Sequence, residues 1–172
     1  SAKEPIEYVL CPHLLKEFRN RWFLYGSTAN NLTLFNLPLD RIVKVEPSDK
    51  PYRDNPNFDP ERFHEDVIGV SKNIGDKPKR VVFWADSNQV GYICTKPLHS
   101  SQRIEDENPE EGGCVFSINV VVNFELYSVL MSYGPGIKVI SPQKVVRHMR
   151  NLMSKAHWLY NKEEKIQSKE NK

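Results

Sequence analysis

The chain has 172 residues, of which 39% are hydrophobic and 27% are charged, so it can bury a packed core and is not a disordered chain. The 24 lysines and arginines stand against 22 acidic residues, for a formal net charge of only +2. This balance excludes a basic coat over the whole surface, and any contact with nucleic acid requires a local cluster of cations.

The first part of the chain has the pattern of short β-strands. Apolar residues alternate with polar ones, which predicts strands at residues 6–11, 14–18, 21–25, 32–37 and 41–45. Arg19-Asn20 has the chemistry of a turn between two of them. With a further strand at residues 67–71, these elements predict a small barrel, because closure removes exposed sheet edges.

Between those strands lies a stretch of different composition. Residues 46–60 hold four prolines and few aliphatic side chains, which predicts a loop. Asp59-Pro60 then has the pattern of a helix start, and we expect a short helix to about residue 65. Residues 73–78 are polar and contain Gly and Pro, so we place the domain boundary there, with one domain at 1–77 and a second at 78–172.

The second domain alternates strands and helices. We predict strands at 80–85, 100–105, 115–122 and 137–140, and helices at about 86–95, 123–132 and 142–160. Asp86 and Asn123 are the expected N-cap residues of the first two helices. The order β-α-β-β-α-β predicts a ferredoxin-like domain, followed by a long helix and a charged, frayed tail. The overall prediction is an α+β protein.

The expected compartment is the cytoplasm. Cys11, Cys94 and Cys114 are widely spaced and form no CxxC pair, which fits reduced thiols and gives no sign of a zinc site. No apolar run reaches the ~18–20 residues needed to span a bilayer, so no membrane contact is expected. The N-terminus lacks the pattern of a secretory signal.

No enzyme motif is present in the sequence. There is no G-x-S-x-G nucleophile elbow and no glycine-rich phosphate loop of either common type. The five histidines have no metal-ligand spacing, and we expect neither a metal nor a cofactor. A nucleic-acid-processing enzyme would need carboxylates facing the basic strands, where we find only Asp40 and Glu17. We therefore expect a protein that is not an enzyme.

Basic residues fall on or beside the strands of the first domain, next to aromatic ones. His13, Lys16, Arg21 and Arg41 are the principal members, with Tyr25 nearby. Guanidinium groups match phosphate oxygens, and aromatic rings stack on bases, so this set suits a phosphate- or base-bearing ligand. The alternative is a solvated face whose aromatic residues point into the core.

Three spaced blocks in this part of the chain resemble the WYL domain of bacterial transcription regulators. They are Pro12 to Lys16, Arg21 to Gly26 with Trp22-Phe23-Leu24 in place of the usual triplet, and Leu39 to Ile42. The second half resembles the extension that commonly follows WYL domains, at Pro97 to Gln102, Asn123 to Leu126 and Ile140 to Pro142.

The resemblance implies an Sm/SH3-like β-barrel that senses a ligand, with a nucleotide-like molecule or single-stranded nucleic acid as the favoured class. It also implies a homodimer, and promoter binding through a helix-turn-helix that this chain does not contain. The ligand-binding residues it implies are His13, Lys16, Arg21, Tyr25 and Arg41. Asn36 and Pro38 stand where many members carry arginines, which leaves room for a smaller ligand or a lost site. The alternative function is a homodimerisation module without a ligand.

Overall fold

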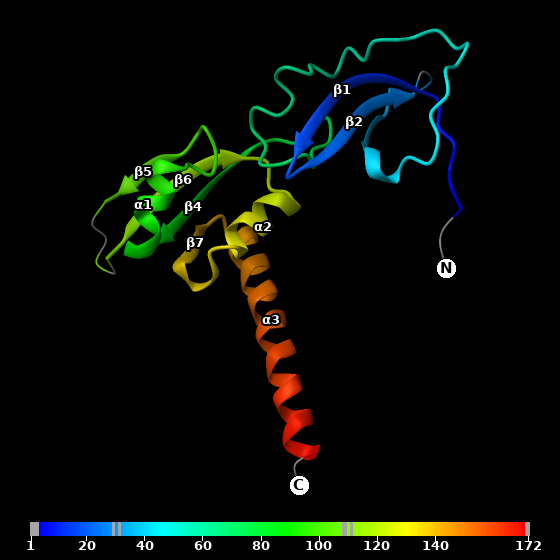
Figure 1. The fold of residues 1–172 in the computed structure, drawn as a ribbon. Helices are drawn as coiled ribbons and strands as arrows, with labels where there is room; N and C mark the ends of the chain where they lie inside the picture. The colour runs from blue at the N-terminus through cyan, green and yellow to red at the C-terminus, as the bar shows by residue number, and fades with distance from the viewer. Residues whose placement is uncertain (1–3, 29, 31, 108–109, 111, 171–172) are drawn as a thin grey trace. The chain divides into compact units, whose positions relative to one another are not determined.

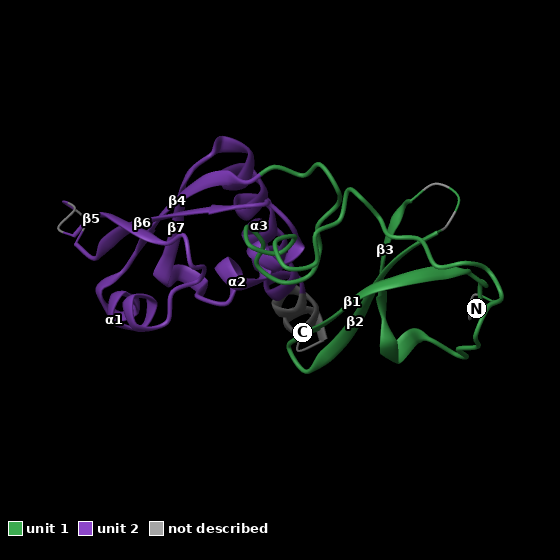
Figure 2. Ribbon diagram, turned by 90° about the horizontal axis from the view of Figure 1, so that it is seen from above, with its two compact units in different colours: residues 1–77 green, residues 78–172 purple. Residues whose placement is uncertain are grey.

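The computed structural model describes residues 4–28, 30, 32–107, 110 and 112–170, with side chains up to Lys162. These residues form an α+β structure with two antiparallel sheets and three α-helices, which confirms the predicted class. Contacts between Cα atoms divide the chain into two compact units, Ser1–Lys77 and Pro78–Lys172 (Figure 2).

The first unit is built on a three-stranded antiparallel sheet (Figure 1). Its strands β1 (Leu10–Phe18), β2 (Arg21–Thr28) and β3 (Leu34–Pro38) follow one another in chain order. Arg19 and Asn20 join β1 to β2 with φ angles of 52° and 61°. Tight hairpins favour two successive residues with positive φ because that turn matches the twist of the strands, and the predicted turn is confirmed.

The pairing of β1 with β2 contains a β-bulge. The register shifts between Pro12, which lies opposite Gly26, and Leu14, which lies opposite Tyr25, so that His13 is the extra residue. Beyond the bulge the pairing is regular as far as Phe18. Residues opposite one another on paired strands project to the same face, so the bulge decides which side chains of β1 share a face with Tyr25.

The core of the first unit lies on that face of the sheet. Tyr25 is fully buried and clusters with Phe58, Phe63 and Val70, all three from the long segment after β3. Side chains attach this segment to the rest of the unit: the amide of Asn36 donates to the Val70 carbonyl over 2.8 Å, and that of Asn55 donates to the Leu32 carbonyl over 2.8 Å.

The expected barrel is wrong: within the described part of the chain, three strands form the sheet and they do not close. Residues 41–45 are not a strand, and Val43 and Val45 are 81% and 80% exposed because nothing packs on their apolar pattern. Leu39–Arg41 forms a short 3-10 helix, η1, instead. Residues 67–71 are not a strand either, and the expected helix near 60–65 is a series of turns.

The second unit contains the remaining elements. In chain order they are β4 (Lys79–Ala85), α1 (Ser87–Thr95), β5 (Arg103–Asp106), β6 (Cys114–Val120), α2 (Phe124–Met131), the 3-10 helix η2 (Gly134–Gly136), β7 (Ile137–Ser141) and α3 (Gln143–Glu170). The strands form one sheet in the order β5-β6-β4-β7, and every neighbouring pair is antiparallel.

Local sequence signals set the helix starts of this unit. The side chain of Asp86 accepts a hydrogen bond from the backbone N–H of Gln89 over 3.0 Å, and that of Asn123 accepts one from Leu126 over 2.8 Å. Both predicted N-caps are therefore confirmed. Figure 2 shows α1 and α2 on the same side of the sheet. Phe83 of β4 lies opposite Phe116 of β6, so both project from the same face of the sheet, and their stacked rings are 5.6 Å apart and fully buried.

Helix α3 packs on the unit with its first turns only. Val145 and Met149 are 1% and 5% exposed, and the helix contacts β7. It then continues to Glu170, ten residues past the predicted end of the helix; Asn171 and Lys172 lie outside the described residues. Figure 1 shows the later turns of α3 extending beyond the other elements of its unit. No helix that the structure describes combines the length and apolarity needed to cross a membrane.

Candidate functional site

The register of β1 and β2 brings two of the predicted cations together. Lys16 lies opposite Phe23, and Arg21 lies opposite Phe18. Lys16 and Arg21 are therefore diagonal neighbours on adjacent strands and project from the same face of the sheet, about 7–8 Å apart at their Cα atoms. Lys16 is half-buried on this face, whereas Arg21 is exposed at its end. Two cations at this spacing can both reach one phosphate group.

A carboxylate already neutralises part of this cluster. Arg21 Nε lies 3.2 Å from Asp40 Oδ2, and each side chain is 50% exposed. Asp40 belongs to η1, whose last residue is Arg41, so the ion pair places the backbone of Arg41 at the same end of the sheet as Arg21. An ion pair this exposed contributes only about 0–1 kcal/mol, which leaves Arg21 available to a stronger anion.

His13 lies at the other end of the same face. Its Nε2 lies 2.7 Å from Ser27 Oγ and its Nδ1 lies 3.1 Å from the Tyr52 hydroxyl. Burial lowers the pKa of His13, and the charge of Asp54 partly offsets this. His13 sits at the level of Tyr25, four residues along β2 from Arg21, which is about 13 Å. The structure therefore does not bring His13 into contact with the Lys16–Arg21 pair.

Tyr25, the fifth predicted residue, is part of the core. Its side chain is fully buried, and its hydroxyl donates to the Val70 carbonyl and accepts a 3.1 Å hydrogen bond from the Asn36 amide. Asn36 lies opposite Tyr25 on β3 and supports the same carbonyl. The sequence suggested a changed ligand contact at Asn36. In the structure, Asn36 instead donates hydrogen bonds to the Tyr25 hydroxyl and the Val70 carbonyl.

His64 was not among the residues predicted from the sequence, yet it packs against Tyr25 in the core of the first unit. Its ring meets the Tyr25 ring edge-on at 4.9 Å, and its Nε2 is buried without a hydrogen-bond partner. Burial lowers the pKa of His64 to about 4, helped by the charges of Lys16 and Lys72 and opposed by Asp66. No motif surrounds His64, so its role depends on a fold that the sequence did not reveal.

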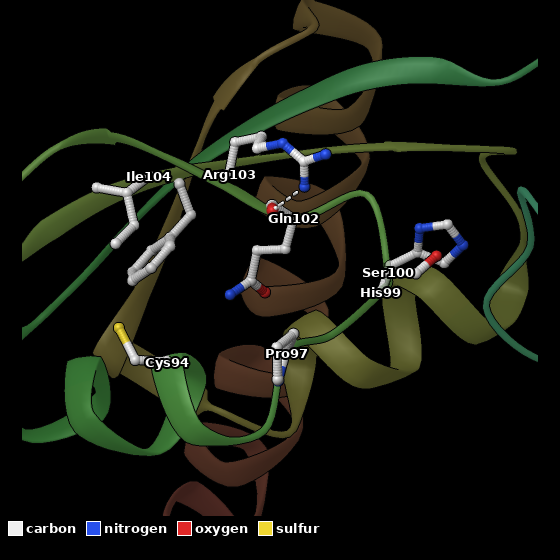
Figure 3. Close-up of a pocket in the computed structure, with 8 residues that line it drawn as sticks. Cys94, Pro97, His99, Ser100, Gln102, Arg103 and Ile104 are labelled. Carbon is white, nitrogen blue, oxygen red and sulfur yellow. Dashed lines mark hydrogen bonds between the residues drawn. The ribbon is translucent and has the colours of Figure 1, made fainter.

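The second unit has a small pocket of about 240 Å³ between α1 and β5 (Figure 3). Gln102 builds its wall: its amide donates to the Ile93 carbonyl over 3.0 Å and its side-chain oxygen accepts from Leu98 N–H over 2.9 Å. Arg103 turns back to the Gln102 carbonyl, at 2.7 Å. The lining residues are Cys94, Pro97, His99, Ser100, Gln102, Arg103, Ile104 and Phe116. Ligand pockets usually measure about 300–1,000 Å³, so this one is small.

The chain shows no assembled metal centre in the portion described: no three His, Cys, Asp or Glu side chains gather closely enough to hold an ion.

Comparison with known proteins bears on the second unit. Residues 77–156 match the family model of the WCX domain. The match begins just before β4 and ends within α3, so it includes the whole four-stranded sheet.

Among solved structures, the chain is similar to proteasome accessory factor B/C (PafBC) of Arthrobacter aurescens. The TM-score is 0.37 and the sequence identity is 16%, over 80% of this chain and 20% of that one. The chain thus spans about a fifth of the length of that protein. A search of curated proteins found no match.

Proposed function

We propose that this chain is the ligand-sensing region of a cytoplasmic bacterial transcription regulator, not an enzyme, and that its ligand is a nucleotide-like molecule or single-stranded nucleic acid. The WCX domain supports this proposal because it is part of WYL-containing regulators. The WYL-like sequence blocks of the first unit support it independently. For the second unit, the antiparallel order β5-β6-β4-β7 favours the ferredoxin-like description.

The observation that carries the proposal is the diagonal pairing of Lys16 and Arg21 on one face of the sheet. A phosphate oxygen can accept from the Lys16 ammonium and, by replacing the Asp40 carboxylate, from the Arg21 guanidinium. Arg41 adds a third cation from η1. Asp40 then acts as an internal substitute for the ligand, and binding exchanges one anion for another.

A sensor must also bind its ligand more tightly in one state than in the other. Release of Asp40 from Arg21 provides such a difference in ligand affinity between two states of the first unit, because η1 carries Asp40 and contacts β2. In the regulator we propose, this change would shift the equilibrium between arrangements of DNA-binding domains that lie outside this chain, and the regulator would act as a homodimer.

The test is fluorescence anisotropy with a short labelled single-stranded oligonucleotide at about 50 and about 200 mM salt. Wild-type affinity should fall with salt as counterions are released. An Arg21→Ala/Arg41→Ala variant should bind at least about tenfold more weakly, since each charge-assisted hydrogen bond contributes about 1.5–3 kcal/mol. Asp40→Asn should bind more tightly, because Arg21 loses its internal partner.

Arg62→Ala is the matched control. Arg62 also forms an exposed ion pair, with Glu65 at 3.6 Å, but lies on another segment. It should leave binding unchanged. No binding at either salt concentration, or equal binding by wild type and the double variant, rejects the site and leaves a homodimerisation module without a ligand as the remaining function.

A further inference from the structure

The outer face of α3 is strongly basic. Between Gln143 and Lys162 the helix carries five lysines and arginines and no acidic residue. All five side chains are exposed: Lys144, Arg147, Arg150, Lys155 and Lys162. Without them, the chain would have 19 basic and 22 acidic residues and a net negative charge. Positive charge is therefore concentrated on α3 and is not spread evenly over the chain.

Within the described side chains, no carboxylate neutralises these cations. Every ion pair that the structure shows among described side chains lies elsewhere, and none joins any of these five to a carboxylate within 4 Å. Lys162 Nζ lies 5.2 Å from the centre of the exposed Trp158 ring. A face of unpaired cations interrupted by an aromatic ring is suited to an anionic partner.

The position of the apolar stripe decides which anionic partner fits. At 100° per residue, Val145 and Met149 lie on the side of the helix opposite Arg147 and Ser154. That apolar side is buried against the helix's own unit over the first turns. A helix that lies in a lipid surface needs its apolar stripe exposed between flanking cations. On α3 that stripe is covered over the first turns, and the large exposed apolar side chains are confined to Trp158, Leu159 and Tyr160 among the described residues. An exposed apolar surface this short, beside cations that run the length of the helix, favours a polyanion in water over a lipid surface.

We infer that the outer face of α3 contacts the sugar-phosphate backbone of duplex DNA. From Lys144 to Lys162 the face extends about 27 Å in a straight line. A duplex presents about one charge per 1.7 Å, so a rigid helix of this length meets several phosphates at once. The exposed Asn151 and Ser154 add neutral hydrogen-bond donors between the cations.

This inference goes beyond the proposed function, which assigns an anionic ligand to the sheet of the first unit. Contacts to phosphates position a protein on DNA without reading its sequence. In a transcription regulator, α3 would therefore add affinity to a complex whose sequence specificity comes from another domain.

The experiment measures binding of the full chain to a labelled duplex of random sequence, about 30 base pairs long, over a series of salt concentrations. For four or five phosphate contacts, the logarithm of affinity should fall with the logarithm of salt with a slope of about −4. An Arg147→Ala/Arg150→Ala/Lys155→Ala variant should lose about two to three of that slope and bind at least about tenfold more weakly at low salt. Circular dichroism checks that it remains folded, as expected for exposed positions.

Two control variants separate this surface from general charge and from the first unit. Lys50→Ala/Lys79→Ala/Lys96→Ala removes the same charge from exposed positions outside α3 and should retain duplex binding. Arg21→Ala/Arg41→Ala should also retain it, whereas the α3 variant should still bind the single-stranded oligonucleotide. The two binding assays therefore test the α3 surface and the site on the first unit independently of each other.

Three results would overturn the inference: no duplex binding by wild type, equal loss in the lysine control, or co-sedimentation with anionic phosphatidylserine vesicles that depends on the α3 cations while duplex binding does not.

Discussion

His64 shows how a single side chain couples the interior of the first unit to the cation cluster. Its Nε2 is enclosed without a partner, the Tyr25 and Phe63 rings pack on it, and two lysines lie near enough to disfavour its charge. A neutral imidazole can remain in this setting, but an imidazolium would have to be buried beside like charges. The residue is therefore a source of acid sensitivity in the fold.

The direction of that sensitivity follows from the pKa of His64, which is about 4 in the folded protein and lies well below the ordinary histidine value of 6.5. Between those values the unfolded chain binds more protons, so the free energy of unfolding falls as pH falls. After allowance for partial exposure, we expect a loss of about 1 kcal/mol from pH 7 to pH 5. Chemical denaturation at the two pH values measures it, and His64→Phe should reduce the loss.

His157→Gln, at an exposed position of α3, is the control for that variant and should retain the wild-type dependence. An unchanged pH dependence in His64→Phe would show that other groups cause the acid sensitivity.

The turn before β6 depends on backbone geometry at two glycines. Gly112 and Gly113 both have positive φ, of 70° and 80°. A Cβ on Gly113 would lie 2.1 Å from the Ala85 carbonyl oxygen, at the end of β4, whereas one on Gly112 would meet nothing within 4 Å. The close approach lets the last residues of β4 pair with the first of β6.

We therefore expect Gly113→Ala to lower the free energy of unfolding by about 2–4 kcal/mol, the sum of positive-φ strain and a backbone clash. Gly112→Ala has the strain alone and should lose about 1 kcal/mol. Thermal and denaturant unfolding of the two variants compares them. Equal losses would mean that the clash relaxes without cost and that the approach of the two strands is not tight.

At the scale of helices, strands and turns, the elements predicted correctly from the sequence are those whose form depends on residues close to them in the chain. The hairpin turn at Arg19-Asn20 and the caps at Asp86 and Asn123 need only neighbours in the chain. Residues 41–45 have the alternation of a strand but stay exposed, because pairing requires a partner edge that the local pattern cannot specify. The segment containing Val70 is held by side chains of Tyr25 and Asn36 rather than by a strand ladder.

The same distinction applies to the candidate site. The sequence placed Lys16 and Arg21 on neighbouring strands, and the register puts them on one face. It did not show that Tyr25 is interior, because burial of that ring depends on Phe58 and Phe63 from a segment expected to be a plain loop and a helix. His64 was missed for the same reason.

On the scale of the whole molecule, each unit has a core of its own. The first buries the small aromatic cluster around Tyr25, and the second buries both Phe83 and Phe116 together with Ile93, Leu126 and Leu130 from its helices. The first unit has 77 residues and relies on a long segment without regular structure. Units of this size bury a smaller fraction of their surface and are correspondingly marginal.

We therefore expect a fragment of residues 78–162 to fold alone, with a cooperative thermal transition and dispersed amide resonances in solution. A fragment of residues 1–77 should be less stable than this one. Circular dichroism and nuclear magnetic resonance spectra of the two fragments make the comparison. A disordered 78–162 fragment would show that its core is incomplete without the first unit.

The bulge at His13 has a further consequence for how this chain can change over time. Side chains alternate between the two faces of a strand, and the extra residue shifts this alternation by one position. As a result, Cys11 before the bulge and Leu14 after it both face inward. Deletion of His13 would leave β1 a regular strand with Leu14 and Lys16 still facing inward, whereas loss of a residue beyond the bulge, such as Leu15, would turn the rest of the strand over and direct Glu17 inward and Lys16 to solvent. Gain or loss of a residue in the long segment after η1 carries no such inversion, so the chain can vary in length there far more freely than at its first strand.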